Sequence, residues 1–205
     1  MKTRNIFYLF ISVGVSVLLY YTFRGDDTIQ AYTRQIVKER QEKDEFMRSA
    51  DASPFATKKD SFGGLKYFPP DTKFRIQANL RPTEKKNVIT LGTNDGKSQA
   101  YLTYAYAEFD FENLHNKLLI LEVLEEGPDR GKLFLAFADQ TSANETYGAG
   151  RYLDVKKVPG ASTITLDFNN AYNPYCAYSD AFSCPFPPAE NMLKIAIKAG
   201  ELTYK

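Results

Sequence analysis

The chain has no tryptophan, a single histidine, two cysteines and almost no net charge. Because His115 is the one imidazole, a zinc or iron site built on several histidines is impossible. Two thiolates without a nearby histidine also fall short of the four ligands of structural zinc, so we expect no metal and no other cofactor. The 26 Lys and Arg residues against 25 Asp and Glu leave a formal charge of +1. This balance argues against a nucleic-acid partner, which requires a basic face on the protein.

Apolar and aromatic residues are, by contrast, plentiful. Hydrophobic residues make up 43 % of the 205-residue chain, which contains 14 Tyr and 15 Phe. This content is enough for a core, and the length suits one domain plus a short appendage. Aromatic and β-branched side chains pack well on a pleated surface, so the composition favours strands.

One N-terminal run, IFYLFISVGVSVLLYYTF at residues 6–23, carries no charge. At about 1.5 Å per residue, a helix of this length spans about 27 Å, close to the ~30 Å hydrocarbon core of a bilayer. No small residues after it suit signal-peptidase cleavage, and no cysteine follows it as in a lipoprotein. We therefore predict a retained transmembrane signal anchor at residues 6–23, behind an arm of residues 1–5. Because this arm is short, we expect it inside the cell and the rest of the chain outside.

Residues 24–54 predict a helical stalk. Asp27 or Thr28 can cap the helix, and Pro54 forces the residue before it out of helical geometry. Residues 38–45 (KERQEKDE) are polar or charged on every side, which is typical of a solvated helix. A coiled-coil or partner helix is the alternative.

From residue 55 onward the apolar pattern alternates as in strands. Residues 73–80 (KFRIQANL) place apolar side chains on one face, and residues 93–96 (TNDG) supply a hairpin turn. We predict a mainly β fold: a single antiparallel barrel- or sandwich-like domain over residues 55–205, with about eight strands. In residues 100–109 the bulky side chains are Leu102, Tyr104 and Tyr106. The strands are expected at 73–80, 87–91, 100–109, 118–123, 133–138, 152–158, 163–168 and 193–198.

Three pieces of the C-terminal half are distinctive: FADQTSANETYGAGRYLDV, LDFNNAYNPYCAYSDAFSCPFPPAEN and IAIKAGE. They contain TYGxGRYL, LDFNxAYNPxCAY, CPxPPxxN and AGE, and in this combination the chain resembles the bacterial family known as domain of unknown function 1684. With the piece KERQEKDEFMR…SPF, the likeness covers roughly residues 30–205. Asn170 and Phe186 depart from the pattern without disturbing it. The resemblance gives family membership and implies no activity, because the family is uncharacterised. The predicted anchor and short arm lead us to expect a bacterial cell-membrane protein with its domain on the periplasmic side.

Charged residues bracket the TYGAGRY turn, whose glycines permit unusual backbone conformations or a close approach. One interpretation is a pocket in which Arg151 grips an anionic group, with Asp139 or Glu145 as general base or hydrogen-bond acceptor. The other interpretation is a structural salt bridge that holds the turn to the domain. Further ligand-binding candidates in this turn are Tyr147 and Tyr152.

A second polar group follows in LDFNNAYNPY. Asx side chains bond to their own backbone, so an ordered loop is one interpretation. The density of amides and phenols would also suit a sugar or peptide ligand, because binding residues concentrate on loops of rigid scaffolds. The candidate ligand-binding residues here are Asp167, Asn169, Tyr172 and Asn173.

The two cysteines, Cys176 and Cys184, flank the loop AYSDAFS. Outside the cytoplasm we expect them to form a disulfide, which would stabilise the domain by about 2–3 kcal/mol through its short loop. A redox-active pair and a metal site are the alternatives, in that order.

These patterns lead to three hypotheses about function. The first is a membrane-tethered extracytoplasmic β-domain that binds a small or extended polar ligand near Arg151 and Tyr172. The second is a hydrolase-like enzyme that uses Asp139 or Glu145 as acid or base and Arg151 as electrostatic clamp. The third is a scaffold or interaction protein of the cell envelope. The sequence favours a binding domain over an enzyme.

Overall fold

The computed structural model of the protein describes residues 28–156 and 158–204. The predicted arm and membrane segment lie outside these residues, so the anchor stays a prediction. Within the described residues, no helix combines the length and the apolar composition needed to cross a bilayer. The chain divides into two compact units between Arg40 and Gln41. The described part of the first unit, residues 28–40, is helical.

The second unit begins with the last helical residues, 41–49. Met47 is fully buried in an aromatic cluster that includes Phe55. The hydroxyl of Ser53 donates to the Met47 carbonyl at 2.5 Å and accepts from the Phe55 N–H at 3.0 Å. Residues 41–54, predicted as part of the stalk, thus belong to the same compact unit as the strands.

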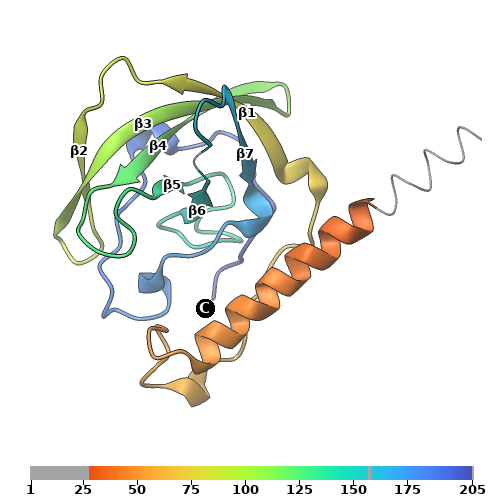
Figure 1. The fold of residues 1–205 in the computed structure, drawn as a ribbon. Coiled ribbons are helices and arrows are strands. Elements are labelled where there is room, and N and C mark those ends of the chain that lie inside the picture. The colour runs from red at the N-terminus through yellow and green to blue at the C-terminus, as the bar shows by residue number, and fades with distance from the viewer. Residues whose placement is uncertain (1–27, 157, 205) are drawn as a thin grey trace, which may run out of the picture. The chain divides into compact units, whose positions relative to one another are not determined.

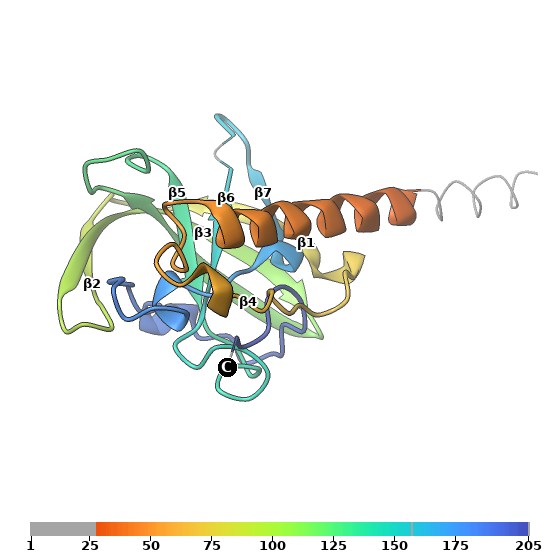
Figure 2. The same ribbon diagram turned by 90° about the horizontal axis from the view of Figure 1, so that it is seen from below.

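Seven strands make up one antiparallel sheet, which curls into a half-barrel (Figures 1 and 2). Their order in the sheet is β6-β5-β4-β3-β1-β7, and β2 pairs with β3 beside β1. The prediction of a mainly β, antiparallel fold is therefore confirmed. The strands are β1 (Arg75–Pro82), β2 (Val88–Gly92), β3 (Ser98–Phe111), β4 (Leu114–Val123), β5 (Leu133–Phe137), β6 (Arg151–Val155) and β7 (Thr163–Asp167).

The predicted eighth strand, residues 193–198, is wrong. This segment bends at residues 194 and 195 and hydrogen-bonds to a loop instead of joining the sheet. The Leu193 N–H donates to the Ala138 carbonyl at 2.8 Å, and the Gln140 N–H donates to the Ile195 carbonyl at 3.0 Å. Its alternating apolar residues are nevertheless buried in the main core. Alternation of apolar and polar residues indicates that one face of a segment is buried. Here that face is buried although the segment forms no ladder of hydrogen bonds with a neighbouring strand.

In the middle of β3, at residues 102–107, the small residues are buried and the bulky ones between them are half exposed. Ala105 and Ala107 are almost fully inaccessible, and the register with β4 shifts between Thr103 and Ala105. This bulge adds one residue to the strand, so the side chains before and after it face opposite sides of the sheet. The half-exposed residues are Leu102, Tyr104 and Tyr106.

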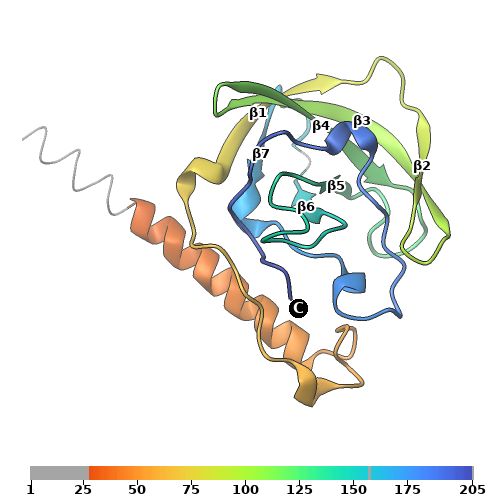
Figure 3. The same cartoon turned by 180° about the vertical axis from the view of Figure 1, so that it is seen from behind.

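The strands β4, β5 and β6 are covered on both faces. Leu118 and Ile120 of β4 lie in the main core, which the C-terminal segment closes. Leu119 and Leu121 lie in a second cluster on the other face. Burial of each such side chain stabilises the fold by about 1.5–3 kcal/mol. Burial on both faces explains why β4 and β5 contain continuous apolar runs. The C-terminal chain, blue in Figure 3, runs around β5 and β6 and packs Tyr172, Tyr175, Cys176, Phe182 and Cys184 against them.

Candidate ligand-binding site

Arg151, at the start of β6, is buried with 1 % of its surface exposed. Its Nη2 donates to Asp139 Oδ2 at 2.8 Å and to the Ile197 carbonyl at 2.9 Å, and its Nη1 donates to the Ala199 carbonyl. Asp139 Oδ1 accepts from the backbone N–H and the hydroxyl of Thr141 at 2.7 and 2.6 Å. Burial lowers the pKa of Arg151, and Asp139 raises it in part. The Arg151–Asp139 pair therefore links β6, the loop after β5 and the C-terminal segment in the interior of the protein.

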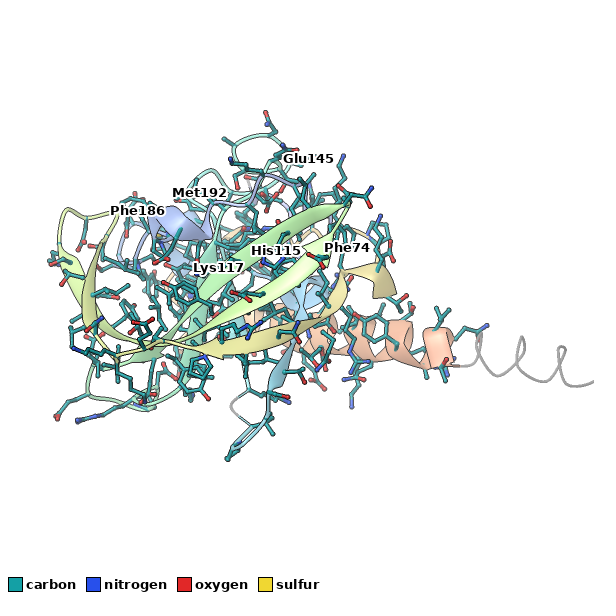
Figure 4. The ribbon with its side chains drawn as sticks, turned by 90° about the horizontal axis from the view of Figure 1, so that it is seen from above. Phe74, His115, Lys117, Glu145, Phe186 and Met192 are labelled. Atoms are coloured by element: carbon teal, nitrogen blue, oxygen red, sulfur yellow. The ribbon has the colours of Figure 1, made fainter. Side chains whose placement is uncertain are left out.

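The geometry does not bring the two proposed acid–base residues together. Asp139 is paired with Arg151 in the interior, whereas Glu145 lies at the periphery of the molecule (Figure 4). Glu145 accepts from Lys198 Nζ at 3.1 Å, and 42 % of its side chain is exposed. His115 lies on the surface and pairs with Asp110 at 2.9 Å.

Two glycines of the signature are required by close packing. Gly150 has φ +90°, and a Cβ there would lie 2.6 Å from the Phe137 carbonyl oxygen and 2.7 Å from Pro187 Cγ. Gly200 has φ +76°, and its Cβ would lie 2.5 Å from the Ala171 carbonyl oxygen. Only glycine fits both the space and the backbone conformation at these positions. The second glycine of TYGxGRYL and the glycine of AGE therefore serve folding.

The predicted amides of the second cluster are also buried and engaged. Asn169 accepts from the Asp71 N–H at 2.9 Å and donates to the Asp71 carbonyl at 2.8 Å. Asp167 Oδ1 accepts from the Asn169 N–H at 3.2 Å. Asn173 Nδ2 donates to the Leu202 carbonyl at 2.8 Å. These side chains order the loops, and neither amide is available at the surface.

Asn191 also has a buried, hydrogen-bonded amide, and it lies between two strands. The sequence did not single it out. Its Oδ1 accepts from the Leu119 N–H at 2.7 Å, and its Nδ2 donates to the carbonyls of Leu119 and Ala136 at 2.9 and 2.8 Å. The amide thus fills the gap where β4 and β5 separate. The asparagine of CPxPPxxN was the signal that could have found it.

Sequence reasoning also missed a second buried carboxylate, Glu201. Its Oε2 accepts from Lys43 Nζ at 3.1 Å, its Oε1 accepts from Asn173 Nδ2 at 2.9 Å, and Tyr178 donates its hydroxyl proton to Oε1. Lys43 lies in the KERQEKDE run, which predicts a solvated helix, yet 26 % of its side chain is exposed. Burial lowers the pKa of Lys43, and Glu201 raises it in part.

Lys43 connects this pair to a polar surface patch. Its Nζ lies 4.4 Å from the centre of the Tyr172 ring, and the Tyr172 hydroxyl donates to Asp154 Oδ1 at 2.8 Å. Asp154 is exposed, and Tyr172 and Tyr175 are half buried. Burial, followed by Asp154, raises the pKa of Tyr172. We call Lys43, Asp154, Tyr172 and Tyr175 the Tyr172 patch.

The Tyr172 patch has a rigid base. Tyr172 and Tyr152 exchange two backbone hydrogen bonds at 2.8 and 3.0 Å, which attaches the loop to the edge of β6. The Tyr152 side chain is buried and donates to the Pro185 carbonyl at 2.6 Å. Of the tyrosines predicted to bind a ligand, Tyr147 and Tyr172 are half exposed and Tyr152 is buried.

Residues 60–202 match the model of the family described as "Protein of unknown function (DUF1684)". The chain belongs to this family. It is also similar to a solution NMR structure of an uncharacterised protein from gene locus rrnAC0354 of Haloarcula marismortui, with 36 % identity and a TM-score of 0.65. The likeness covers 87 % of this chain and 97 % of that chain. No curated protein matches the sequence.

In this DUF1684 protein, the predicted disulfide is absent, because Cys176 and Cys184 are free thiols. The Cys176 N–H donates to Cys184 Sγ at 3.2 Å, and the hydrogen bond between the two thiols raises the pKa of Cys176 and lowers that of Cys184. Hydrogen bonds order the loop instead: Asn94 Oδ1 accepts from the Cys184 N–H at 2.7 Å. The prediction had rested on an expected oxidising compartment, not on geometry. Among the described residues, no three His, Cys, Asp or Glu side chains are grouped to hold a metal ion.

Proposed function

We propose that this DUF1684 protein is a membrane-tethered, extracytoplasmic β-domain that binds a small polar ligand at the Tyr172 patch. The observation that carries the proposal is the exposure of this patch within an otherwise internal network. Lys43 and Asp154 both reach solvent, whereas Arg151, Asn169 and Asn173 are buried and engaged with the protein itself. The uncharged run at residues 6–23 supports the tether.

The patch offers the chemistry of a small-ligand site. Two phenol rings supply flat apolar faces, the Asp154 carboxylate accepts hydrogen bonds, and the Lys43 ammonium donates them. The Tyr175 ring packs against Phe182 with centroids 5.1 Å apart, so its position is defined. A ligand the size of one sugar ring or one amino acid matches this set of groups.

Ligand screening of the full chain in detergent micelles tests the proposal. A library of sugars, amino acids and small amines is screened by thermal shift, and hits are measured by ligand-observed NMR. Asp154→Asn removes a charged acceptor, and we expect it to weaken a genuine ligand at least about tenfold. Tyr175→Phe should weaken it less. Glu108→Gln is the matched control, because Glu108 is a partly exposed carboxylate paired with Arg81 at 3.1 Å outside the patch. Hits that bind all three variants equally would refute the site.

The tether is tested separately from the ligand. We expect the full chain to fractionate with membranes and a variant lacking residues 1–27 to be released from them. We also expect protease added to intact spheroplasts to digest the domain. Protection of the domain would contradict the proposed orientation.

The hydrolase-like alternative has no support in the geometry of its two candidate carboxylates. Asp139 faces Arg151 in a closed interior, and Glu145 pairs with Lys198 at the surface. A general acid–base pair requires both groups within reach of one substrate.

A further inference from the structure

We propose that Tyr172, Asn173 and Glu201 form a binding site for a primary alkylammonium group, and that Lys43 of the chain itself occupies this site in the structure. The inference rests on the proposed function and names its ligand class: a small molecule that ends in a primary ammonium group and takes the place of the Lys43 head group. We call the three residues the ammonium site.

The first argument is the fit of the anionic end. Glu201 is completely buried, and its Oε2 lies 3.1 Å from Lys43 Nζ. The same carboxylate is fixed by hydrogen bonds from Asn173 and Tyr178 to its other oxygen. A carboxylate held in this way cannot turn toward solvent, so the cation must come to it.

The second argument is the aromatic face. The Tyr172 ring lies beneath the ammonium with its centroid 4.4 Å from Nζ. A cation within about 6 Å of a ring centroid is attracted by the ring quadrupole. The Tyr172 hydroxyl is held by Asp154 at 2.8 Å and its backbone by Tyr152, so the ring is fixed before any cation binds.

The third argument is a free acceptor. Asn173 Oδ1 is buried and has no hydrogen-bond partner among residues 28–156 and 158–204. The amide cannot be turned around, because its Nδ2 donates to two acceptors, Glu201 Oε1 at 2.9 Å and the Leu202 carbonyl at 2.8 Å. The Lys43 ammonium bonds to Glu201 and leaves this acceptor unpaired, whereas a free primary ammonium has further N–H donors for it.

These three groups select for one kind of cation. A primary ammonium has three N–H donors and a small head, whereas a quaternary ammonium has none and a guanidinium is planar and larger. The site is built from the C-terminal signature alone, and its present occupant comes from the helical residues 41–49. The Lys43 side chain is 26 % exposed, so part of it reaches solvent, in contrast to the completely buried Glu201.

A chemical-rescue experiment on the full chain tests the proposal. Lys43→Ala removes the internal ammonium and leaves Glu201 buried without its cation, so we expect the Tm to fall by about 10 °C. Millimolar n-butylammonium chloride should restore at least half of this loss, because the ligand stabilises the folded state to which it binds. Tetramethylammonium chloride and sodium chloride at equal ionic strength should restore none.

Two variants serve as controls. Lys198→Ala removes a surface lysine that pairs with Glu145 at 3.1 Å, and its Tm should neither fall substantially nor respond to n-butylammonium. Lys43→Ala combined with Glu201→Gln removes the anionic end of the site and should not be rescued. If Lys43→Ala does not fold in buffer, the yield of folded protein after refolding with each salt replaces the Tm.

The outcomes separate this inference from the proposed function. Equal responses of Lys43→Ala to n-butylammonium and tetramethylammonium, or rescue of the double variant, would overturn the ammonium site. Rescue that succeeds while ligands of the wild-type chain bind Asp154→Asn normally would overturn the Tyr172 patch alone. If both hold, the hits on the wild-type chain should carry a primary ammonium group.

Discussion

Two ion pairs, Arg151–Asp139 and Lys43–Glu201, each have a buried carboxylate in the C-terminal signature, and they differ in how far the cation is enclosed. In the Arg151–Asp139 pair the side chains are 1 % and 0 % exposed, and backbone carbonyls take up further guanidinium donors. In the Lys43–Glu201 pair the exposures are 26 % and 1 %, and the ammonium contacts the Glu201 carboxylate and the Tyr172 ring. The guanidinium fork matches several fixed acceptors at once, whereas the ammonium is a compact charge at the end of a flexible stem. A buried charge in a signature therefore indicates folding or binding according to what else surrounds it.

The largest expected loss of stability comes from breaking the Arg151–Asp139 pair. Asp139→Ala leaves the Arg151 guanidinium buried without a counter-charge, which should lower the free energy of unfolding by about 3–5 kcal/mol. Urea denaturation followed by fluorescence measures the change. A loss below about 1 kcal/mol would show that water reaches Arg151, contrary to its 1 % exposure.

The turn beside this pair should be the next most sensitive position. Gly150→Ala places a Cβ 2.6 Å from the Phe137 carbonyl oxygen at φ +90°. The strained conformation alone costs about 1–3 kcal/mol, and the steric clash adds to it. Gly148→Ala is the matched control, because its nearest contact would be an ordinary 3.4 Å from the side chain of Ala143. Equal Tm values for the two variants would contradict the predicted clash.

The Lys43–Glu201 pair should make the stability of the chain depend on pH in the alkaline range. Burial lowers the pKa of Lys43 in the folded chain below the ordinary value of 10.5. Between the folded and unfolded pKa values the unfolded chain binds more protons, so the contribution of Lys43 to stability rises as pH rises toward 10.5 and is constant above it. We expect the wild-type chain to gain stability relative to Lys43→Met over this interval, measured by urea denaturation at several pH values. The opposite slope would mean that Glu201 outweighs burial.

An exposed ion pair should contribute least. Glu145→Gln removes the pairing with Lys198, both of whose side chains are about half exposed. We expect a change in unfolding free energy below about 0.5 kcal/mol, which should shrink further at high salt. A larger effect would indicate that the loop around Glu145 is more closely packed than its exposure implies.

Much of the fold followed from local pattern. The alternation in residues 73–80 and the turn at 93–96 correspond to β1 and to the hairpin between β2 and β3. Residues 193–198 have the same alternation, but no neighbouring strand is in place to pair with them. Period-two burial is a property of the segment, whereas a ladder requires a partner from elsewhere in the chain.

The candidate site was predicted less well than the fold. The signature pointed to Tyr172, which is partly exposed, and also to Arg151 and Asn169, which are buried. Lys43 was assigned to a solvated helix because charge is the only local property of its segment. Its partner Glu201 lies 158 residues away, and nothing in a single sequence joins the two.

The sequence by itself determined the antiparallel β character, the turns and the glycine positions, since these depend on steric preferences of neighbouring residues. Tertiary structure alone decided which of the charged residues are buried and which are exposed to solvent. The reason is physical: exposure and desolvation depend on every atom packed around a group, and those atoms come from distant segments. Arg151 and Lys43 are both cations opposite a buried carboxylate, and only the folded chain seals Arg151 and leaves the Lys43 side chain partly exposed.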